Sequence, residues 1–283
     1  MTRFSHFISE VNRFFFCPKV YIALLFQFAL MHFFTSGIRA LSIESGCKSS
    51  IWLFPFLFGY VYSQLTHGLI TTYIFSSVPF MERKEIYTII RKGRKRWLAD
   101  AYAKIVGVSI LIAVANELMS ILVMLPYISL ESGWGKIYKT IALTDAATVF
   151  DIQISVPYLL INQFSPFEAT LNVMLRMIIL SIILGIIMFT VGLMSSGLVA
   201  VITGTCFSGL VIIKENLAYC FPWIRYISPF SWMNLVDNNS NHIDSFDRWN
   251  MYLLILSCVV IICVAIDVHL IRRIDFNFID EEE

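Results

Sequence analysis

The most restrictive feature of this sequence is the run of residues 51–81, which contains no aspartate, glutamate, lysine or arginine. A bilayer core is about 30 Å thick, and an α-helix needs about 20 apolar residues to cross it. The chain is 58% hydrophobic and 14% charged, whereas soluble domains are about 45–50% apolar and about 25% charged. Its mean hydropathy is +0.73. Because so few polar side chains cannot cover a soluble core, we expect an all-α integral membrane protein.

Six runs are long and apolar enough to be candidate spans, at residues 20–36, 51–81, 105–130, 177–194, 198–213 and 251–271. The run 51–81 is long enough to tilt, or to bend near Gly59 or Gly68. Cytoplasmic loops are enriched in lysine and arginine. With both termini inside, thirteen of the 21 lysine and arginine residues fall in inner segments. We therefore expect six transmembrane helices with cytoplasmic N- and C-termini, the fourth and fifth forming a hairpin with a turn at 195–197.

Charge and cysteine content argue against two other classes of protein. Lysine and arginine total 21 and aspartate and glutamate 20, so the net charge is +1, whereas nucleic-acid-binding domains carry a basic surface. The six cysteines include no CxxC pair, which disfavours a zinc site or a disulfide framework. Cys47 and Cys220 would both lie on the outer side, where they either pair or, as we favour, remain free thiols.

Two inner segments have distinctive patterns. In residues 1–18, aromatic and aliphatic residues recur at helical spacing until Pro18 interrupts them. This predicts an interfacial amphipathic helix, or alternatively a helical lead-in to the first span. Residues 82–97 combine a charged start, isoleucines at amphipathic spacing, a break at Gly93 and a basic restart. The pattern favours a docking surface, although a basic inner loop also sets topology and binds anionic lipid.

Two outer segments are longer than simple turns. Within residues 131–176, Ser165, Pro166 and Glu168 have the spacing of a capping box with proline at the first helical position. The fourth helix is therefore predicted to begin near Pro166, after either a small ordered cap or a loose linker. Residues 216–237 are aromatic and contain two prolines. They either re-enter the membrane or anchor at its outer interface as an aromatic belt.

Glu117 is the one carboxylate near the middle of a candidate span. A charge inside a membrane is costly and is a functional hypothesis by default. No intramembrane lysine or arginine is available as its partner. A structural role, with the carboxyl protonated or hydrogen-bonded to a neighbouring helix, therefore stands beside a role in a transport pathway.

The order of these parts resembles the membrane subunit of ABC-2 type transporters over essentially the whole chain. The shared order is an interfacial helix, two spans, a cytoplasmic helix, three spans, an aromatic re-entrant segment and a final span. The closest local matches are residues 82–97 and the sequence from Tyr226 to Trp232 before the sixth span. The resemblance implies one transmembrane domain over residues 1–283, of the type V exporter kind. The segment 131–176 is longer than the commoner family pattern.

In that family the inner segment is a coupling helix that fits a groove of a cytoplasmic ATPase. The resemblance therefore implies ATPase contacts at Glu82, Arg83, Lys84, Glu85, Tyr87 and Arg91. It also implies that residues 216–237 close the outer end of the pathway, for which the candidate residues are Glu117, Phe221, Trp223, Phe230 and Trp232. The chain has no GxxxxGK[ST] phosphate loop. ATP and Mg²⁺ are therefore expected on a separate ATPase chain, with no catalytic residue, metal or cofactor in this one.

The resemblance implies a permease subunit of the cell membrane that pairs with an identical or related subunit. It would export a hydrophobic or amphipathic peptide, lipid or drug. An ATP-independent channel or carrier would more often show repeated polar faces or inverted repeats, which we do not find. A membrane-embedded enzyme is the second alternative, but its candidate pair, His32 and His67, lacks a nearby carboxylate and HExxH spacing. The third is an immunity or sensor protein that binds an antimicrobial peptide on the same scaffold.

Overall fold

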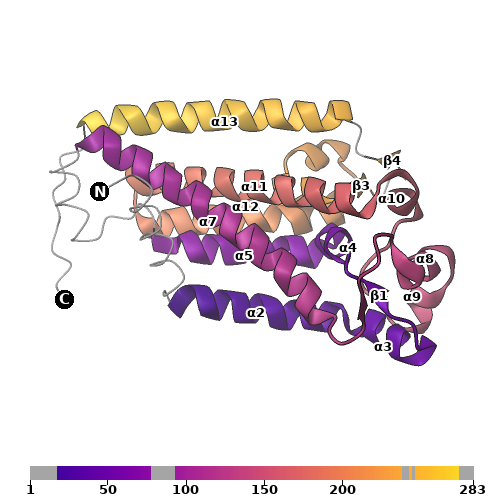
Figure 1. Cartoon of the computed structure of the whole chain (residues 1–283). Coiled ribbons are helices and arrows are strands. Elements are labelled where there is room, and N and C mark those ends of the chain that lie inside the picture. The colour runs from indigo at the N-terminus through magenta and orange to yellow at the C-terminus, as the bar shows by residue number, and fades with distance from the viewer. Residues whose placement is uncertain (1–17, 78–92, 219, 238–241, 244–245, 274–283) are drawn as a thin grey trace.

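The computed structural model describes residues 18–77, 93–218, 220–237, 242–243 and 246–273. These residues form a bundle of long helices with a cap of short elements at one end (Figure 1). The predicted all-α class is confirmed, because the strands of the described residues are only two residues long: β1 (Ser49–Ser50), β2 (Ile128–Ser129), β3 (Val236–Asp237) and β4 (His242–Ile243).

Four helices are long and apolar enough to cross a membrane: α7 (Arg94–Val123), α11 (Pro166–Met194), α12 (Gly197–Leu217) and α13 (Phe246–Arg273). A fifth span results if α2 (Pro18–Phe34) and α3 (Ser36–Ser45), which meet at a bend of 50°, count as one. The chain therefore has the helices of a multi-pass membrane protein. The start of α2 and the end of α13 lie at the same end of the bundle (Figure 1).

Arg39 stabilises the bend between α2 and α3. Its Nη2 donates to the carbonyl oxygen of His32 at 2.7 Å, and its Nη1 donates to Thr35 Oγ1 at 2.9 Å and to the carbonyl of Val123 at 3.4 Å. The last carbonyls of a helix have no partner within it. The guanidinium therefore satisfies carbonyls at the ends of both α2 and α7.

The predicted second span is divided into α4 (Phe54–Gly59), α5 (Val61–Ile74) and η1 (Phe75–Ser77). The break lies beside Gly59, where a bend was expected, and Tyr60 has an extended backbone. Gln64 Nε2 donates to the carbonyls of Phe58 and Gly59 at 2.9 and 3.4 Å, replacing bonds that the helix loses there. A helix of 14 residues is about 21 Å long, so α5 alone is shorter than the bilayer core, and residues 78–81 lie outside the described residues.

Helix α11 is the central element, with 61% of its most apolar stretch buried against 17% for α13. It begins as predicted at Pro166, because Ser165 Oγ accepts from the N–H of Glu168 and Glu168 Oε2 accepts from the N–H of Ser165. The predicted hairpin with α12 is also confirmed, since α11 ends at Met194 and α12 begins at Gly197.

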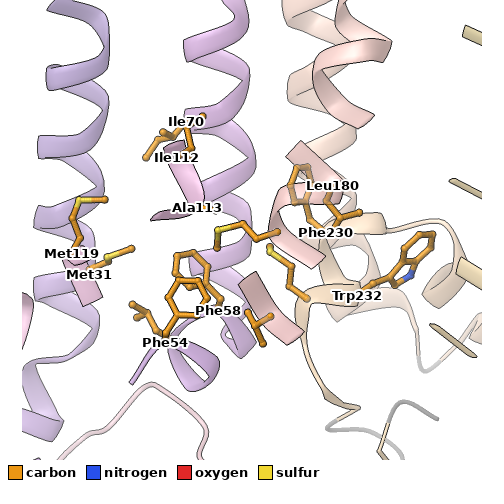
Figure 2. Packing of buried hydrophobic residues seen from close by; sticks show 14 of the residues in the cluster. Met31, Phe54, Phe58, Ile70, Ile112, Ala113, Met119, Leu180, Phe230 and Trp232 are labelled. Atoms are coloured by element: carbon orange, nitrogen blue, oxygen red, sulfur yellow. The ribbon is translucent and has the colours of Figure 1, made fainter. Parts of the chain in front are cut away.

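The apolar core of the bundle is formed by side chains from most of its described helices. Figure 2 shows side chains of this core, which include Met31, Phe54, Ile70, Ile112, Leu180 and Phe230, from α2, α4, α5, α7, α11 and η3 (Pro229–Met233). Helices α5 and α12 approach most closely at glycines. A Cβ on Gly68 would lie 2.6 Å from Ser208 Oγ, and a Cβ on Gly204 would lie 2.9 Å from Thr72. These glycines therefore set the separation of the two helices.

Residues 128–163 form an ordered cap, which decides between the two alternatives left open by the sequence. Its helices are α8 (Gly135–Leu143), α9 (Ala146–Val149) and α10 (Tyr158–Gln163), and β2 pairs in parallel with β1. Tyr138 is fully buried, donates to the carbonyl of Ser50 at 3.0 Å and contacts the ring of Phe56. Burial raises the pKa of Tyr138, so its hydroxyl remains a donor. Cys47 and Cys220 are both free.

Candidate functional site

The segment after α12 turns back against the bundle. It contains two short helices, η2 (Pro222–Tyr226) and η3. Phe230 and Trp232 are 0% and 4% exposed, whereas Phe221 and Trp223 are 49% and 57% exposed. The four aromatic residues predicted to act together are therefore divided, because η3 enters the bundle and η2 stays on its surface.

Arg176 connects η3 to α11, and the sequence analysis did not single it out. Its side chain is buried, and Nη1 donates to the carbonyls of Trp232 at 2.7 Å and Asn234 at 3.4 Å. The Trp232 ring in turn stacks on Tyr252 of α13, with centroids 4.1 Å apart and planes 2° apart. The sequence signal that could have identified it is a lone arginine ten residues after Pro166, where the helix is predicted to begin. A charge so far from a helix end requires polar partners from another element.

A polar cluster lies directly beneath η3. His67 of α5 is fully buried, with its ring edge-on to Phe58 and Phe230. Its Nε2 lies 3.0 Å from Ser181 Oγ, and its Nδ1 lies 3.4 Å from Asn116 Nδ2. Both ring nitrogens thus have partners other than His32, the residue with which the sequence suggested a pair. The cluster joins α5, α7 and α11.

The order serine, histidine, asparagine is that of a nucleophilic triad, but the hydrogen bonds run the wrong way. Asn116 Nδ2 also donates to the carbonyl of Ile112 at 2.9 Å, so the amide NH₂ group faces His67 Nδ1. Nδ1 is then the acceptor, and the ring proton is on Nε2, which donates to Ser181. A base that activates serine must instead accept its proton. With all three side chains buried, the arrangement serves to hold helices together.

Several buried oxygens of α2, α5 and α7 lack a hydrogen-bond partner among the described residues. They are Gln27 Oε1 on α2, Ser63 Oγ on α5, and Asn116 Oδ1 and Glu117 Oε2 on α7. An unpaired buried acceptor costs about 1–3 kcal/mol. Glu117 itself is partly exposed, so its carboxyl lies on the flank of α7. Thr170 Oγ1, Ser228 Oγ and Asp267 Oδ1 also lack a partner among the described residues, so such atoms are spread over the bundle, where water or another polar group could bind them.

The predicted ATPase-contact residues, Glu82, Arg83, Lys84, Glu85, Tyr87 and Arg91, lie outside the described residues, as does the predicted interfacial helix except Pro18. Of residues 82–97, only the last five are described. The expected break at Gly93 is confirmed, because this glycine has a φ of +84° and α7 begins at Arg94.

Within the described part of the chain, no group of three or more histidine, cysteine, aspartate or glutamate side chains is placed to hold a metal ion. Comparison with protein-family models, with curated proteins and with solved structures gives no match to this chain.

Proposed function

We propose that this chain is the membrane-spanning permease subunit of an ATP-driven transporter of the ABC-2 type. The observation that carries the proposal is the aromatic segment after α12, whose Phe230 and Met233 are fully buried. A segment that folds back into the outer end of a helical bundle is suited to closing a pathway there. The buried polar side chain of His67 contacts Phe230 of this segment.

The order of elements supports six spans. Four long helices and the bent pair of α2 and α3 provide five, and the sixth is the run 51–81, whose described helices are α4, α5 and η1. An even number of spans keeps both termini on one side, in agreement with the positions of the start of α2 and the end of α13 (Figure 1). The side with more lysine and arginine is proposed to be the cytoplasm, and the membrane to be the cell membrane.

The proposal requires partners. The chain lacks a phosphate loop, so ATP and Mg²⁺ are bound by a separate ATPase that docks on residues 82–97. A second permease subunit, identical or related, completes the pathway. The apolar bundle is suited to a hydrophobic or amphipathic cargo, and export is the proposed direction.

Co-purification tests the proposal. The tagged chain is solubilised from native membranes in mild detergent, and its stoichiometric partners are identified by mass spectrometry beside an ATPase assay. We expect an ATP-binding chain that is lost when residues 82–91 are scrambled. It should be retained in the control variant K136E/K139E, whose changes lie on exposed positions of α8 in the cap. A chain that purifies alone, or a partner retained after scrambling, contradicts the proposal.

The ordered cap favours one alternative on the same scaffold, an immunity or sensor protein that recognises an antimicrobial peptide. A folded outer surface of three short helices is able to present fixed side chains to a ligand. Peptide binding to the cap that neither requires ATP nor stimulates its hydrolysis would support this alternative over export.

A further inference from the structure

Among the described side chains of helix α13, the most deeply buried lie near its two ends. Its buried residues are Tyr252 and Leu256 near the outer end, and Asp267 and Ile271 near the inner end. Every residue from 257 to 266 is at least partly exposed. In a membrane the hydrophobic effect does not drive helices together, because lipid tails are as apolar as the side chains, so close packing and hydrogen bonds hold the helices in place. Val260 and Cys263 of this stretch contact the core while remaining partly exposed, so the most deeply buried contacts of α13 are those near its ends.

The contacts of the inner end are polar. Asp267 is fully buried, and its Oδ2 accepts from the Tyr102 hydroxyl of α7 at 2.6 Å. The Thr190 hydroxyl of α11 lies 3.1 Å from the same oxygen and 3.0 Å from the carbonyl of Ile186. One buried carboxyl thus joins three helices. We call Tyr102, Thr190 and Asp267 the inner joint.

The inner joint lies close to the described end of residues 82–97. Arg94, the first residue of α7, donates from Nη1 to the carbonyl of Ile271 at 3.0 Å. Trp97 and Tyr102 each contact the buried ring of Phe189, with centroids 5.8 Å apart. The first turns of α7, which include the end of residues 82–97, therefore contact both α11 and α13.

We propose that the inner joint makes the inner end of α13 move as one body with the start of α7. Tyr102, Thr190 and Asp267 are positioning residues, which pass a displacement of residues 82–97 to α13. The coupling to an ATPase rests on the proposed function, whereas the docking of α13 on α7 does not. A hydrogen bond to a buried polar group stabilises the contact that it makes. Loss of the Tyr102 hydroxyl should therefore lower the ratio of docked to undocked α13 about tenfold.

Distance measurement by double electron–electron resonance tests the docking without nucleotide. Spin labels are placed at Ala99 on α7 and His269 on α13, both exposed, in a chain whose six cysteines are replaced, reconstituted in nanodiscs. We expect one narrow distance for the wild type, and a second, longer population for Y102F and for Y102F/T190V. Y102F keeps the ring against Phe189, so its effect reports the hydroxyl alone.

Matched variants separate docking from general destabilisation. T203V removes a partly exposed hydroxyl of α12, which donates to the carbonyl of Val199 on the same helix. This variant should keep the narrow distance. D267N keeps an acceptor for Tyr102 and should stay close to wild type, whereas D267L should undock. A distribution for Y102F/T190V as narrow as that of T203V overturns the proposal.

A second measurement tests the coupling. In the complex with its ATPase, the distance from Ala99 to His269 should stay constant between the nucleotide-free and vanadate-trapped states of the wild type. In Y102F/T190V this distance should change between the two states while ATP hydrolysis continues. If no ATPase binds, the proposed function fails but the nucleotide-free result still decides the docking. If the ATPase binds and the wild-type distance changes, the shared motion is wrong.

Discussion

Arg176 shows how a single charge organises the outer end of the bundle. Its guanidinium donates to two carbonyls at the end of η3, where free carbonyls give the helix end a partial negative charge. The ring of Trp232, which also belongs to η3, stacks on the ring of Tyr252 of α13. One side chain therefore holds η3 against α11 and indirectly positions the part of α13 around Tyr252.

Replacement of Arg176 by methionine should release η3. The carbonyls of Trp232 and Asn234 lose a donor inside the bundle, and each unpaired buried acceptor costs about 1–3 kcal/mol. We expect lower stability in nanodiscs and faster amide hydrogen exchange over residues 229–237, measured by mass spectrometry. R176K, which keeps the charge and one donor group, should have an intermediate effect. Equal exchange in both variants and the wild type would show that the contacts do not hold the segment.

The capping box at the start of α11 predicts a pH dependence. The N–H of Ser165 donates to the carboxylate and lowers the pKa of Glu168. A group whose pKa is lowered on folding stabilises the protein above its unfolded value, about 4.3 for glutamate, and loses that contribution as pH falls through the folded value. The thermal midpoint of the wild type should therefore fall in acid towards that of E168Q.

The control for this measurement is E44Q, which makes the same charge change at an exposed position of α3. Its midpoint should follow the wild type in parallel across the pH range. A difference between wild type and E168Q that does not narrow in acid would contradict the role of the ionised carboxylate.

At the scale of elements, the pairing of α5 with α12 depends on the absence of side chains. A Cβ on Gly204 would lie 2.8 Å from Met188 Sδ and 2.9 Å from Thr72, whereas a Cβ on Gly209 of the same helix meets nothing within 4 Å. Gly204 therefore lies where there is no room for a side chain, whereas Gly209 of the same helix has open space around it.

Valine at these two positions should have different effects. G204V must push α12 away from α5 and α11, and overpacking of this kind costs about 1–3 kcal/mol. G209V should be close to neutral or slightly stabilising, because valine has a higher helix propensity than glycine. Unfolding of both variants in the same detergent measures the difference. Equal stabilities would mean that the close approach of α5 and α12 is not required.

At the scale of the whole molecule, orientation in the membrane is the property on which the proposed function most depends. Lys95 at the start of α7 and Lys139 on α8 are exposed at opposite ends of the bundle. In intact cells, an impermeant maleimide should label K139C in a cysteine-free chain. K95C should be labelled only after permeabilisation. The reverse pattern would place residues 82–97 outside and exclude a cytoplasmic ATPase as their partner.

Local features of the fold were predictable from the sequence because they depend on neighbouring residues. The capping box at Ser165, the start of α11 at Pro166, the break at Gly93 and the turn between α11 and α12 all follow from local backbone chemistry. The second span was less predictable. The sequence predicts a tilt or a bend near Gly59 or Gly68. It does not predict that Gln64 stabilises the break at Gly59, or that α5 is short as a result.

The sequence by itself determined that the helices lie in a lipid bilayer. A chain with 58% hydrophobic residues and long uncharged runs is suited to a bilayer and not to water. Only the tertiary structure decided which faces of the helices meet. In a soluble helix, alternation of polar and apolar residues reveals the buried face, but a helix apolar on all sides carries no such signal. The bonds of Arg176 to η3, of His67 to Ser181 and of Asp267 to Tyr102 join residues far apart in the chain. Their pairing depends on how the helices pack, which no local pattern records.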